Sequence, residues 1–575
     1  MRLLYLLLLL PALLGTTAHA TGGDPCPGSV DGEKRLLWGD LHVHTAHSMD
    51  AWAFGAVATP KEAFAFARGQ PLRLVNGAIK TIDRPLDFAA VTDHAETWDL
   101  MYLCTDPLYA AQAYCAGLRD LHKRRDSRGI FYDHLLPVLG SAEPREPAAC
   151  RAGDLNCAAA RRAEWRRVQQ VANQANEPCA FTALIGYEWT GSPGGRHWHR
   201  NVIYGTEVVP PEAYDFVRYP RVQSLWRALA ANCGTGCRVL TIPHNLNWAD
   251  GGRTFAVEDE TTSEWALRAR FERLAEIFQE KGASECLPED PARLDADCDF
   301  NLVRENAARA RLSGDDDTPA AAAWARARST YYRSLLARGL AGYGSRADAV
   351  NPLQLGAIGS TDTHFGTPGR VAEASYDRGI STLLADDAIQ LARPDFNPGG
   401  LVAVWAAENT RSAVFDALAR REAYATSGPR IALRFGAGSA DHCRVRPRPA
   451  LDVPMGGTLR AVGTDGPWFV VEAARDVTLL RSVEIIKGEN RDDRLVETVH
   501  AVREFRRGRR MLCLTWRDAD FDAEAPAYWY ARVQEARTPR WSKLLCERAD
   551  LCDEFPQADT LQSERAWSSP VWWLP

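Results

Sequence analysis

The stretch LLWGDLHVHTAHSMD, residues 36–50, decides how the rest of the chain is interpreted. Its apolar first half predicts a buried strand, and Asp40, His42, His44 and Asp50 stand at or just beyond the end of that strand. On a strand, residues two positions apart point to the same face, so the two imidazoles lie side by side. Neutral imidazoles with carboxylates nearby are suitable ligands for a divalent transition metal. We therefore predict a metal site at the end of this strand.

The same pattern recurs four more times along the chain. Four later apolar runs each end in polar residues that could bind a metal. Run 86–92 ends in Asp93 and His94, and run 181–187 ends in Glu188. Run 238–242 is followed by His244 and Asn245, and run 355–359 by Asp362 and His364. Helical sequence separates several of these runs, including a helix with a capping box over 59–69 and a charged helix over 262–281. In a parallel α/β barrel, functional residues gather at the C-terminal ends of the strands. The recurrence therefore predicts a multinuclear metal centre.

The first twenty residues have the features of a secretory signal peptide. Arg2 precedes an apolar run over 3–14 that is too short to span a membrane as a helix, and Ala18, His19 and Ala20 form a cleavage site. Because no Cys stands at that site, we expect no lipid anchor. We expect a protein that is secreted across the inner membrane and is periplasmic or extracellular.

The composition is that of an ordinary globular protein, with 46% apolar and 25% charged residues. The formal net charge of −6 argues mildly against nucleic acid or an anionic membrane as the main partner. The length allows one large domain and at least one smaller one. The oligomeric state does not follow from the sequence.

The 14 cysteines are even in number, and several stand close together in the sequence. The close pairs are Cys104 and Cys115, Cys150 and Cys157, Cys233 and Cys237, Cys286 and Cys298, and Cys546 and Cys552. In an exported protein this pattern favours disulfides, although the pairings do not follow from the sequence. A zinc site with Cys ligands is the alternative.

From about residue 431 the character of the chain changes. Alternating runs rich in aromatic and β-branched residues, such as PWFVVEAA and AYWYARVQEA, replace the mixed helical and strand pattern. They predict a small all-β, sandwich-like domain over 431–575.

Five motifs in order, GDLHVHT, VTDHAE, IGYEWT, PHN and GSTDTH, resemble the PHP (polymerase and histidinol phosphatase) superfamily. More narrowly, HRNVIYG, IFQEKGASE, GGLVAVWAAENTR and ATSGPRIALRF make the chain similar to an exported, PHP-like group of domains of unknown function. The resemblance runs from about residue 36 to the end of the chain. It implies an α/β fold, a distorted (β/α)7 TIM-like barrel over 21–430 with long insertions at about 97–180 and 247–354.

The resemblance also implies a set of metal ligands. One ion would be held by His42, His44, Glu188 and Asp362, a second by Glu188, His199 and His244, and a third by Asp50, His94 and His364. Two or three divalent ions are therefore expected, and the mixture of imidazole and carboxylate ligands suits Zn, Mn or Fe. Asp40 and Asp93 stand beside ligands and either orient an imidazole or bind directly. We interpret the remaining histidines as surface or packing residues: His47, His122, His134, His442 and His500.

Several residues near these motifs are candidates for substrate binding. Arg200 follows His199, Lys281 lies in QEKGASE and Arg370 follows the DTH motif, although each is equally interpreted as an ordinary solvated charge. Asn245 is a candidate hydrogen-bond donor. His197 is interpreted as a substrate contact or an alternative ligand.

These residues predict an exported metal-dependent hydrolase of a small-molecule ester. The best-supported activity is that of a phosphoesterase, acting on phosphodiesters or related phosphate esters, in which a metal-activated hydroxide attacks the ester. Glu188, Asp362 and Arg200 are the expected catalytic residues. One alternative is hydrolysis of carboxyl ester, amide or sulfate bonds on the same fold. The other is a non-catalytic binding protein that metals stabilise.

Overall fold

The computed structural model describes most of the chain beyond its N-terminal segment. The described residues are 26–27, 33–249, 254–287, 295–302, 329–343, 350–376, 386–392, 396–463, 465–491 and 494–575. The predicted signal peptide, residues 1–20, lies outside them. Among the described residues, no helix has both the length and the apolar character needed to cross a membrane.

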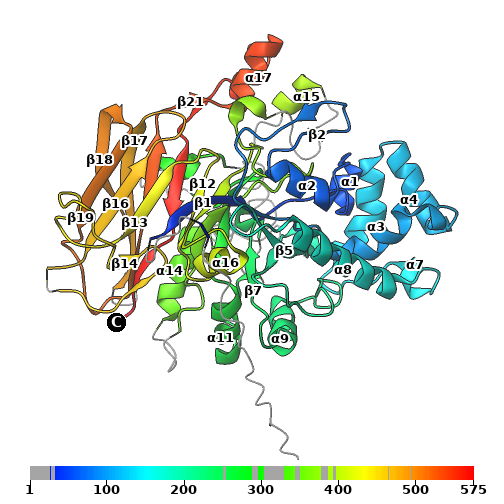
Figure 1. The fold of residues 1–575 in the computed structure, drawn as a ribbon, viewed down its shortest axis with the longest axis horizontal. Helices are drawn as coiled ribbons and strands as arrows, with labels where there is room; N and C mark the ends of the chain where they lie inside the picture. The colour runs from blue at the N-terminus through cyan, green and yellow to red at the C-terminus, as the bar shows by residue number, and fades with distance from the viewer. Residues whose placement is uncertain are drawn as a thin grey trace, which may run out of the picture.

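A large mixed sheet forms the centre of the molecule, and residues 36–40 lie in its middle (Figure 1). Strand β1 (Arg35–Asp40) pairs in parallel with β4 (Phe88–Ala90), which pairs in parallel with β5 (Thr182–Trp189). Strands β6 (Arg200–Tyr204) and β7 (Val239–Pro243) continue the sheet with antiparallel pairing. On its other edge, β1 pairs antiparallel with β11 (Leu401–Ala406).

A second pair of parallel strands lies next to the central sheet. Strand β8 (Leu274–Gln279) pairs in parallel with β10 (Gly356–Gly359), and a short β9 (Gly282–Ala283) follows β8. Strand β8 lies beside β7, and β10 lies beside β11 and β12 (Ala423–Thr426). Among the described residues, these neighbouring strands are not all joined by ladder hydrogen bonds, so the (β/α)7 barrel stays a prediction.

One predicted helix is correct in its details, and another is wrong in its extent. Helix α2 (Pro60–Ala67) begins at Thr59, whose side chain forms a capping box with Glu62. Over 262–281 the sequence predicts one helix, but α11 (Thr262–Phe271) ends early and strand β8 follows. Because the β8 sequence LAEIFQ is buried at every position, it lacks the polar face that would mark a surface helix or strand.

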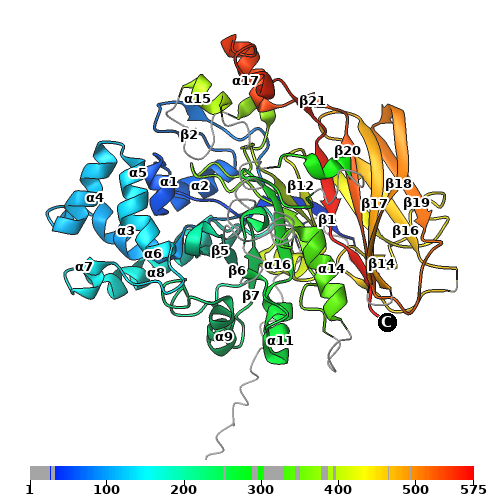
Figure 2. The same ribbon diagram turned by 180° about the vertical axis from the view of Figure 1, so that it is seen from behind.

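The predicted insertion at 97–180 is helical and forms a lobe of its own. It includes α3 (Trp98–Thr105), α4 (Ala113–Lys123), α5 (Ser127–Ile130), a π-helical turn (Phe131–Leu135), α6 (Leu136–Leu139), α7 (Ala148–Arg151) and α8 (Cys157–Ala175). Figures 1 and 2 place this lobe at one end of the molecule and the C-terminal strands at the other. The other helices are α1 (Met49–Ala53), α9 (Val222–Asn232), α14 (Tyr332–Gly342), α15 (Asp387–Leu391) and α16 (Arg411–Ala419).

Besides a two-stranded sheet of β21 (Thr538–Pro539) and β22 (Leu561–Gln562), the C-terminal region contains two larger β-sheets. One contains β13 (Ala432–Ala437), β14 (Val453–Pro454), β16 (Trp468–Ala474) and β19 (Met511–Arg517). The other contains β15 (Thr458–Leu459), β17 (Leu480–Arg491), β18 (Arg494–Arg509), β20 (Ala527–Glu535), β23 (Arg565–Ser568) and β24 (Val571–Trp573). Strand β12 pairs with β23, so the second sheet is continuous with the central one. Helix α17 (Trp541–Ala549) also lies in this region, which is therefore not all-β.

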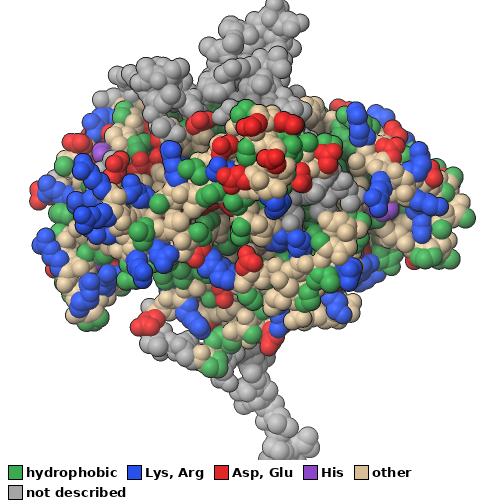
Figure 3. All heavy atoms as spheres, turned by 90° about the horizontal axis from the view of Figure 1, so that it is seen from above, with side chains coloured by type: hydrophobic (Ala, Val, Ile, Leu, Met, Phe, Trp, Pro, Cys, Tyr) green, Lys and Arg blue, Asp and Glu red, His purple; other side chains and the backbone are tan. Residues whose placement is uncertain are grey.

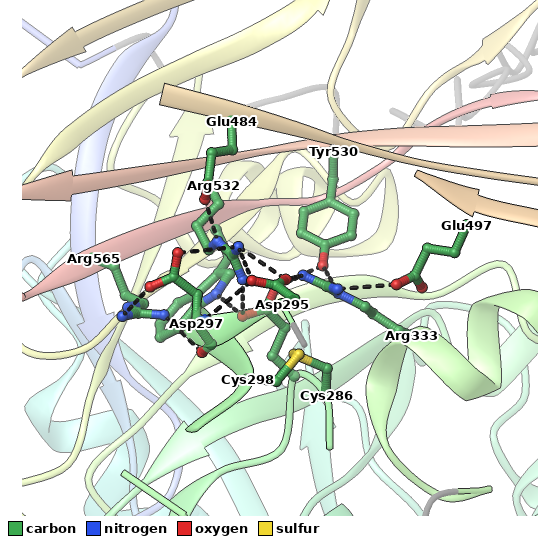
Figure 4. The surroundings of a disulfide bond; sticks show 12 residues. Cys286, Asp295, Asp297, Cys298, Arg333, Glu484, Glu497, Tyr530, Arg532 and Arg565 are labelled. Carbon is green, nitrogen blue, oxygen red and sulfur yellow. Dashed lines mark hydrogen bonds and ion pairs between the residues drawn. A yellow bond between two sulfur atoms is a disulfide. The ribbon is translucent and has the colours of Figure 1, made fainter. Parts of the chain in front are cut away.

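A buried ionic cluster lies where the central strands meet the C-terminal sheet (Figure 4). Glu285, just after β9, accepts hydrogen bonds from Arg333 at 2.9 Å and from Arg532 of β20 at 3.1 Å. The Tyr530 hydroxyl donates to the same carboxylate, and so does the Trp567 indole. We refer to Glu285, Asp295, Arg333 and Arg532 as the junction cluster.

All 14 cysteines form disulfides, so the alternative of a Cys-ligated zinc site is wrong. The five pairs that are close in sequence are bonded to one another. Two long-range bonds join Cys26 to Cys179 and Cys443 to Cys513. Seven disulfides are typical of a protein in an oxidising compartment.

Candidate metal centre

Glu188, near the end of β5, is the residue around which the candidate metal centre is arranged. Its Oε2 atom lies 3.2 Å from the Nε2 atoms of both His42 and His44. Its Oε1 atom lies 2.9 Å from Nδ1 of His199 and 3.2 Å from Nε2 of His244. The carboxylate is buried. It therefore presents one oxygen to each of two pairs of imidazoles.

Asp362 completes the first of these two groups. Its Oδ1 atom lies 3.1 Å from Nε2 of His42 and 3.2 Å from Nε2 of His44. Parallel bridging between Val43 and Thr363 brings the loop after β10 beside the loop after β1. Asp362 adopts a left-handed backbone with φ 56°, a conformation that costs energy and often occurs at functional sites.

A third group forms around Asp50 of helix α1. Its Oδ2 atom lies 3.0 Å from Nε2 of His94 and 3.2 Å from Nε2 of His364. His44 joins these two histidines in a set whose ligand atoms all lie within 4.8 Å of one another. The structure thus brings together all nine residues that the resemblance implied as ligands, and these buried groups could hold metal ions.

Five of the six candidate ligand histidines are held by hydrogen bonds on their other ring nitrogens, and the exception is His244, whose Nδ1 has no partner among the described residues. Nδ1 of His42 contacts Glu276 at 3.0 Å, Nδ1 of His44 contacts Ser48 at 2.9 Å, and Nδ1 of His94 contacts Thr190 at 2.7 Å. Such contacts orient an imidazole and set its tautomer. The donor chemistry and the orientation of the rings both fit a divalent transition metal.

Burial and mutual attraction set the charges in this centre. Burial raises the pKa of Glu188, but His94 and His244 outweigh that effect and hold the pKa well below its ordinary value. Burial also raises the pKa of Asp362, and the charge of His42 again holds it well below. Both carboxyl groups are therefore ionised at neutral pH, the form in which a carboxylate binds a metal.

Asp40 and Asp93 do not face the ligand groups directly. Asp40 accepts hydrogen bonds from the Thr361 hydroxyl at 2.6 Å and from the Gly369 backbone at 2.9 Å. Asp93 accepts from the backbone and hydroxyl of Thr45. Each aspartate fixes a loop that carries ligands, and the ring nitrogens contact other residues, so the prediction that these aspartates orient an imidazole directly is wrong.

Glu276 is the functional candidate that the sequence analysis missed. It lies on β8, in the segment expected to be the end of a helix, and it is buried against His42. The signal was available in the sequence, because an acid inside an otherwise apolar run of six residues requires a buried partner.

Three predicted substrate-binding residues line the same cavity as the ligands: His197, Asn245 and Lys281. The ammonium group of Lys281 contacts Oδ2 of Asp362. Asn245 Nδ2 donates to Nδ1 of His197 at 3.0 Å, and the amide oxygen of Asn245 accepts from Gln279. Asn245, like Asp362, has a left-handed backbone, with φ 53°.

Two predicted arginines are not brought to the centre. Arg200 is fully buried and donates to Glu272 at 2.8 Å and to the carbonyls of Trp198 and Thr254. Successive residues of a strand point to opposite faces, so Arg200 faces away from the side on which His199 lies. Arg370 contacts the carbonyl of Ser375 and does not line the cavity. The predicted catalytic role of Arg200 and the predicted substrate contact of Arg370 are therefore not compatible with where the two side chains lie.

The cavity over the centre has a volume of about 1150 Å³. Besides the ligands, it is lined by the loop at 192–199 and by residues 131–141 of the helical lobe. The other histidines lie outside it: His47, His122, His134, His442 and His500. On the face shown in Figure 3, acidic and basic side chains are intermingled.

The family comparison covers almost the whole described chain. The model of a family described as protein of unknown function (DUF3604) matches residues 31–504 and 490–575. The chain belongs to this family. No curated protein and no solved structure matches it. Because the family match includes both the central strands and the C-terminal sheets, these regions are parts of one family architecture.

Proposed function

We propose that this protein is an exported, metal-dependent phosphoesterase with a PHP-like site, acting in the periplasm or outside the cell. The observation that carries the proposal is the shared carboxylate of Glu188. Since Oε2 faces one pair of imidazoles and Oε1 faces another, Glu188 would help to hold an ion in each of two groups. Paired ions of this kind are typical of phosphate-ester hydrolases.

The bound ions would supply an activated water and would neutralise charge on the attacking and leaving oxygens. Two ions would be held by His42, His44, Glu188 and Asp362 and by Glu188, His199 and His244, and a third by Asp50, His94 and His364. Zn, Mn and Fe all suit these ligands. The open cavity above the ligand groups gives a substrate access to them.

Lys281 supports a substrate with negative charge. Burial lowers the pKa of its ammonium group, but Asp362 and Glu280 outweigh this effect and raise the pKa, so the side chain stays charged. The charge holds Oδ2 of Asp362, which leaves Oδ1 directed at the first pair of histidines. Lys281 thus orients a ligand and adds positive charge beside the cavity.

His197 is placed to donate a proton in a hydrogen bond to the substrate. Burial and the neighbouring His199 lower the pKa of His197 well below its ordinary value, so its ring is neutral. Because Asn245 Nδ2 donates to Nδ1 of His197, the ring proton lies on Nε2. A neutral Nε2–H beside the cavity suits contact with a phosphate oxygen.

The test is the metal content of the purified mature protein, with hydrolysis of bis- and mono-nitrophenyl phosphate. We expect two or more ions per chain, and we expect Mn or Zn to restore activity to the stripped protein. Glu188→Gln is expected to lose both metal and activity, whereas Glu207→Gln, on a side chain that is 72% exposed, should lose neither. A metal-loaded wild type that cleaves carboxyl or sulfate esters and no phosphate ester would overturn the proposal.

A further inference from the structure

The cavity that contains the metal ligands has a second lining of a different chemical kind. Five side chains from the helical lobe, which we call the apolar wall, line it: Phe131, Tyr132, Leu135, Leu136 and Leu139. The wall belongs to the helical lobe over 97–180. One cavity therefore combines a polar, metal-binding part with an apolar part.

Two aromatic side chains of the apolar wall are exposed to solvent, so the packing of the protein core does not explain why they are apolar. Phe131 is 39% exposed and Tyr132 is 57% exposed, although Leu135 and Leu139 beside them are buried. The two aromatic rings contact each other edge to face with centroids 5.5 Å apart. Adjacent exposed apolar side chains at the mouth of a cavity mark a ligand-binding surface.

The apolar wall is fixed in position relative to the metal ligands. The backbone of Ser192, in the loop before His199, donates to the carbonyl of Leu139 at 2.9 Å, and Gly194 donates to the carbonyl of Gly140 at 3.2 Å. Leu135 and Leu139 share an apolar core with Met49, the neighbour of Asp50. The wall and the centre are thus parts of one preformed site.

Positive charge in the cavity is limited. Apart from histidines, the basic side chains among the described residues that line it are Lys281 and Arg196. A polyphosphate or a nucleic acid would require a longer series of cations along its path. The volume of about 1150 Å³ is at the upper end for small-molecule sites and exceeds what a phosphate group alone fills.

We propose that the substrate is a phosphate ester that carries an apolar aryl or alkyl group, which binds against the apolar wall while the phosphate lies at the metal centre. This inference rests on the phosphoesterase activity proposed above. It adds a substrate class, since the ligands alone do not distinguish a polar from an apolar ester.

The first experiment compares p-nitrophenyl phosphodiesters whose second ester group is methyl, butyl or phenyl. We expect kcat/KM of the metal-loaded protein to rise by roughly tenfold or more from methyl to phenyl, because the larger group removes more apolar surface from water. The second experiment measures the Kd of phenylphosphonate and of methylphosphonate. It requires no turnover, and the phenyl compound should bind by a similar factor more tightly.

Variants then assign the preference to the wall. Phe131→Ser and Tyr132→Ser alter exposed side chains, so both should fold, and each should lower the phenyl-to-methyl ratio by about threefold or more. Leu108→Ser, at a side chain of the same lobe that is 79% exposed and outside the cavity, is the matched control and should keep the wild-type ratio.

The outcomes separate this inference from the proposed function. A wild type that cleaves all three esters equally and binds both phosphonates equally would overturn the substrate class and leave the phosphoesterase intact. A protein that cleaves none of them, but binds phenylphosphonate more tightly through Phe131 and Tyr132, would overturn the phosphoesterase and support the apolar ligand. A phenyl preference that the Ser variants do not change would overturn the role of the wall.

Discussion

The metal centre and the junction cluster are both buried groups of charges, yet they are composed differently. At the junction, the carboxylate of Glu285 faces the guanidinium groups of Arg333 and Arg532, which are charged at any ordinary pH. At the centre, the carboxylates of Glu188 and Asp362 face imidazoles at 2.9–3.2 Å. An imidazole can release its proton and bind a metal through the freed nitrogen, whereas a guanidinium group stays protonated. The charges of the junction balance one another, whereas the groups of the centre could also hold metal ions.

The largest effect is expected when the shared ligand is removed. Glu188→Gln should lower phosphoesterase activity by about a thousandfold or more, because the variant loses the charge that two ions share. The free energy of unfolding of the metal-free protein should fall by less than the loss expected at the junction, because imidazoles that lose their counter-charge can release their protons, whereas guanidinium groups cannot. Activity assays and urea unfolding in EDTA give the two values. A metal-free variant destabilised by several kcal/mol would show that the centre is a structural cluster like the junction.

The opposite result is expected at the junction. Glu285→Gln should lower the free energy of unfolding by about 3–5 kcal/mol, because it leaves Arg333 and Arg532 buried without a full counter-charge. Metal content should be unchanged. Urea unfolding measures the loss, and Glu524→Gln, at an exposed side chain of the C-terminal region, is the control. A loss of metal in Glu285→Gln at unchanged stability would contradict the contrast between the two clusters.

The junction also predicts a pH dependence. Burial raises the pKa of Glu285, but Arg532 and Arg333 outweigh it and lower the pKa below its ordinary value. The carboxylate therefore contributes stability above the unfolded-state pKa of about 4.3, and this contribution is lost as the pH falls below that value. Glu285→Gln should consequently flatten the acid limb of the stability profile.

A smaller effect is expected at Glu276, which contacts a ligand and not a metal. Glu276→Gln keeps a hydrogen-bond partner for Nδ1 of His42 but removes its charge. Metal affinity should fall by about 10- to 100-fold, and the set of bound ions should stay the same at saturating metal. Competition with a chelator measures the affinity. An unchanged affinity would show that Glu276 merely fills space behind His42.

Most of the centre could be predicted because its residues stand directly after buried strands. His42, His44, His94, His244 and Asp362 all follow apolar runs that form strands in the structure. Glu276 escaped prediction because it lies inside such a run. In LAEIFQ, burial on both faces removes the alternation that distinguishes a strand from a helix.

Arg200 and Arg370 were placed wrongly in the sequence analysis for a related reason. Arg200 stands next to a ligand in sequence, but neighbouring residues on a strand point to opposite faces. Its partner Glu272 is far from it in the sequence, so no local pattern predicts their contact. The apolar wall likewise depends on how the lobe folds back over the loop at 192–194, a long-range contact that no local pattern encodes.

Glu564 shows a third way of burying a carboxyl group and gives the smallest expected effect. Its Oε1 atom accepts from Gln562 at 2.6 Å, and the same amide donates to Glu373 at 2.7 Å, so two carboxyl groups share one donor. Burial, and then the neighbouring Glu373, raise the pKa of Glu564.

The sign of the resulting pH dependence follows from the protons bound. Between the unfolded-state pKa of about 4.3 and the raised value, the folded protein holds a proton that the unfolded chain releases, so stability falls as the pH rises. Glu564→Gln should remove this fall, by roughly 1–3 kcal/mol between pH 5 and pH 8. Urea unfolding of the metal-free protein at pH 5 and at pH 8 measures this fall in stability. Glu554→Gln, at an exposed side chain, is the control. Parallel pH profiles for wild type and variant would mean that Glu564 is ionised in the fold, and that it is paired as the junction carboxylates are.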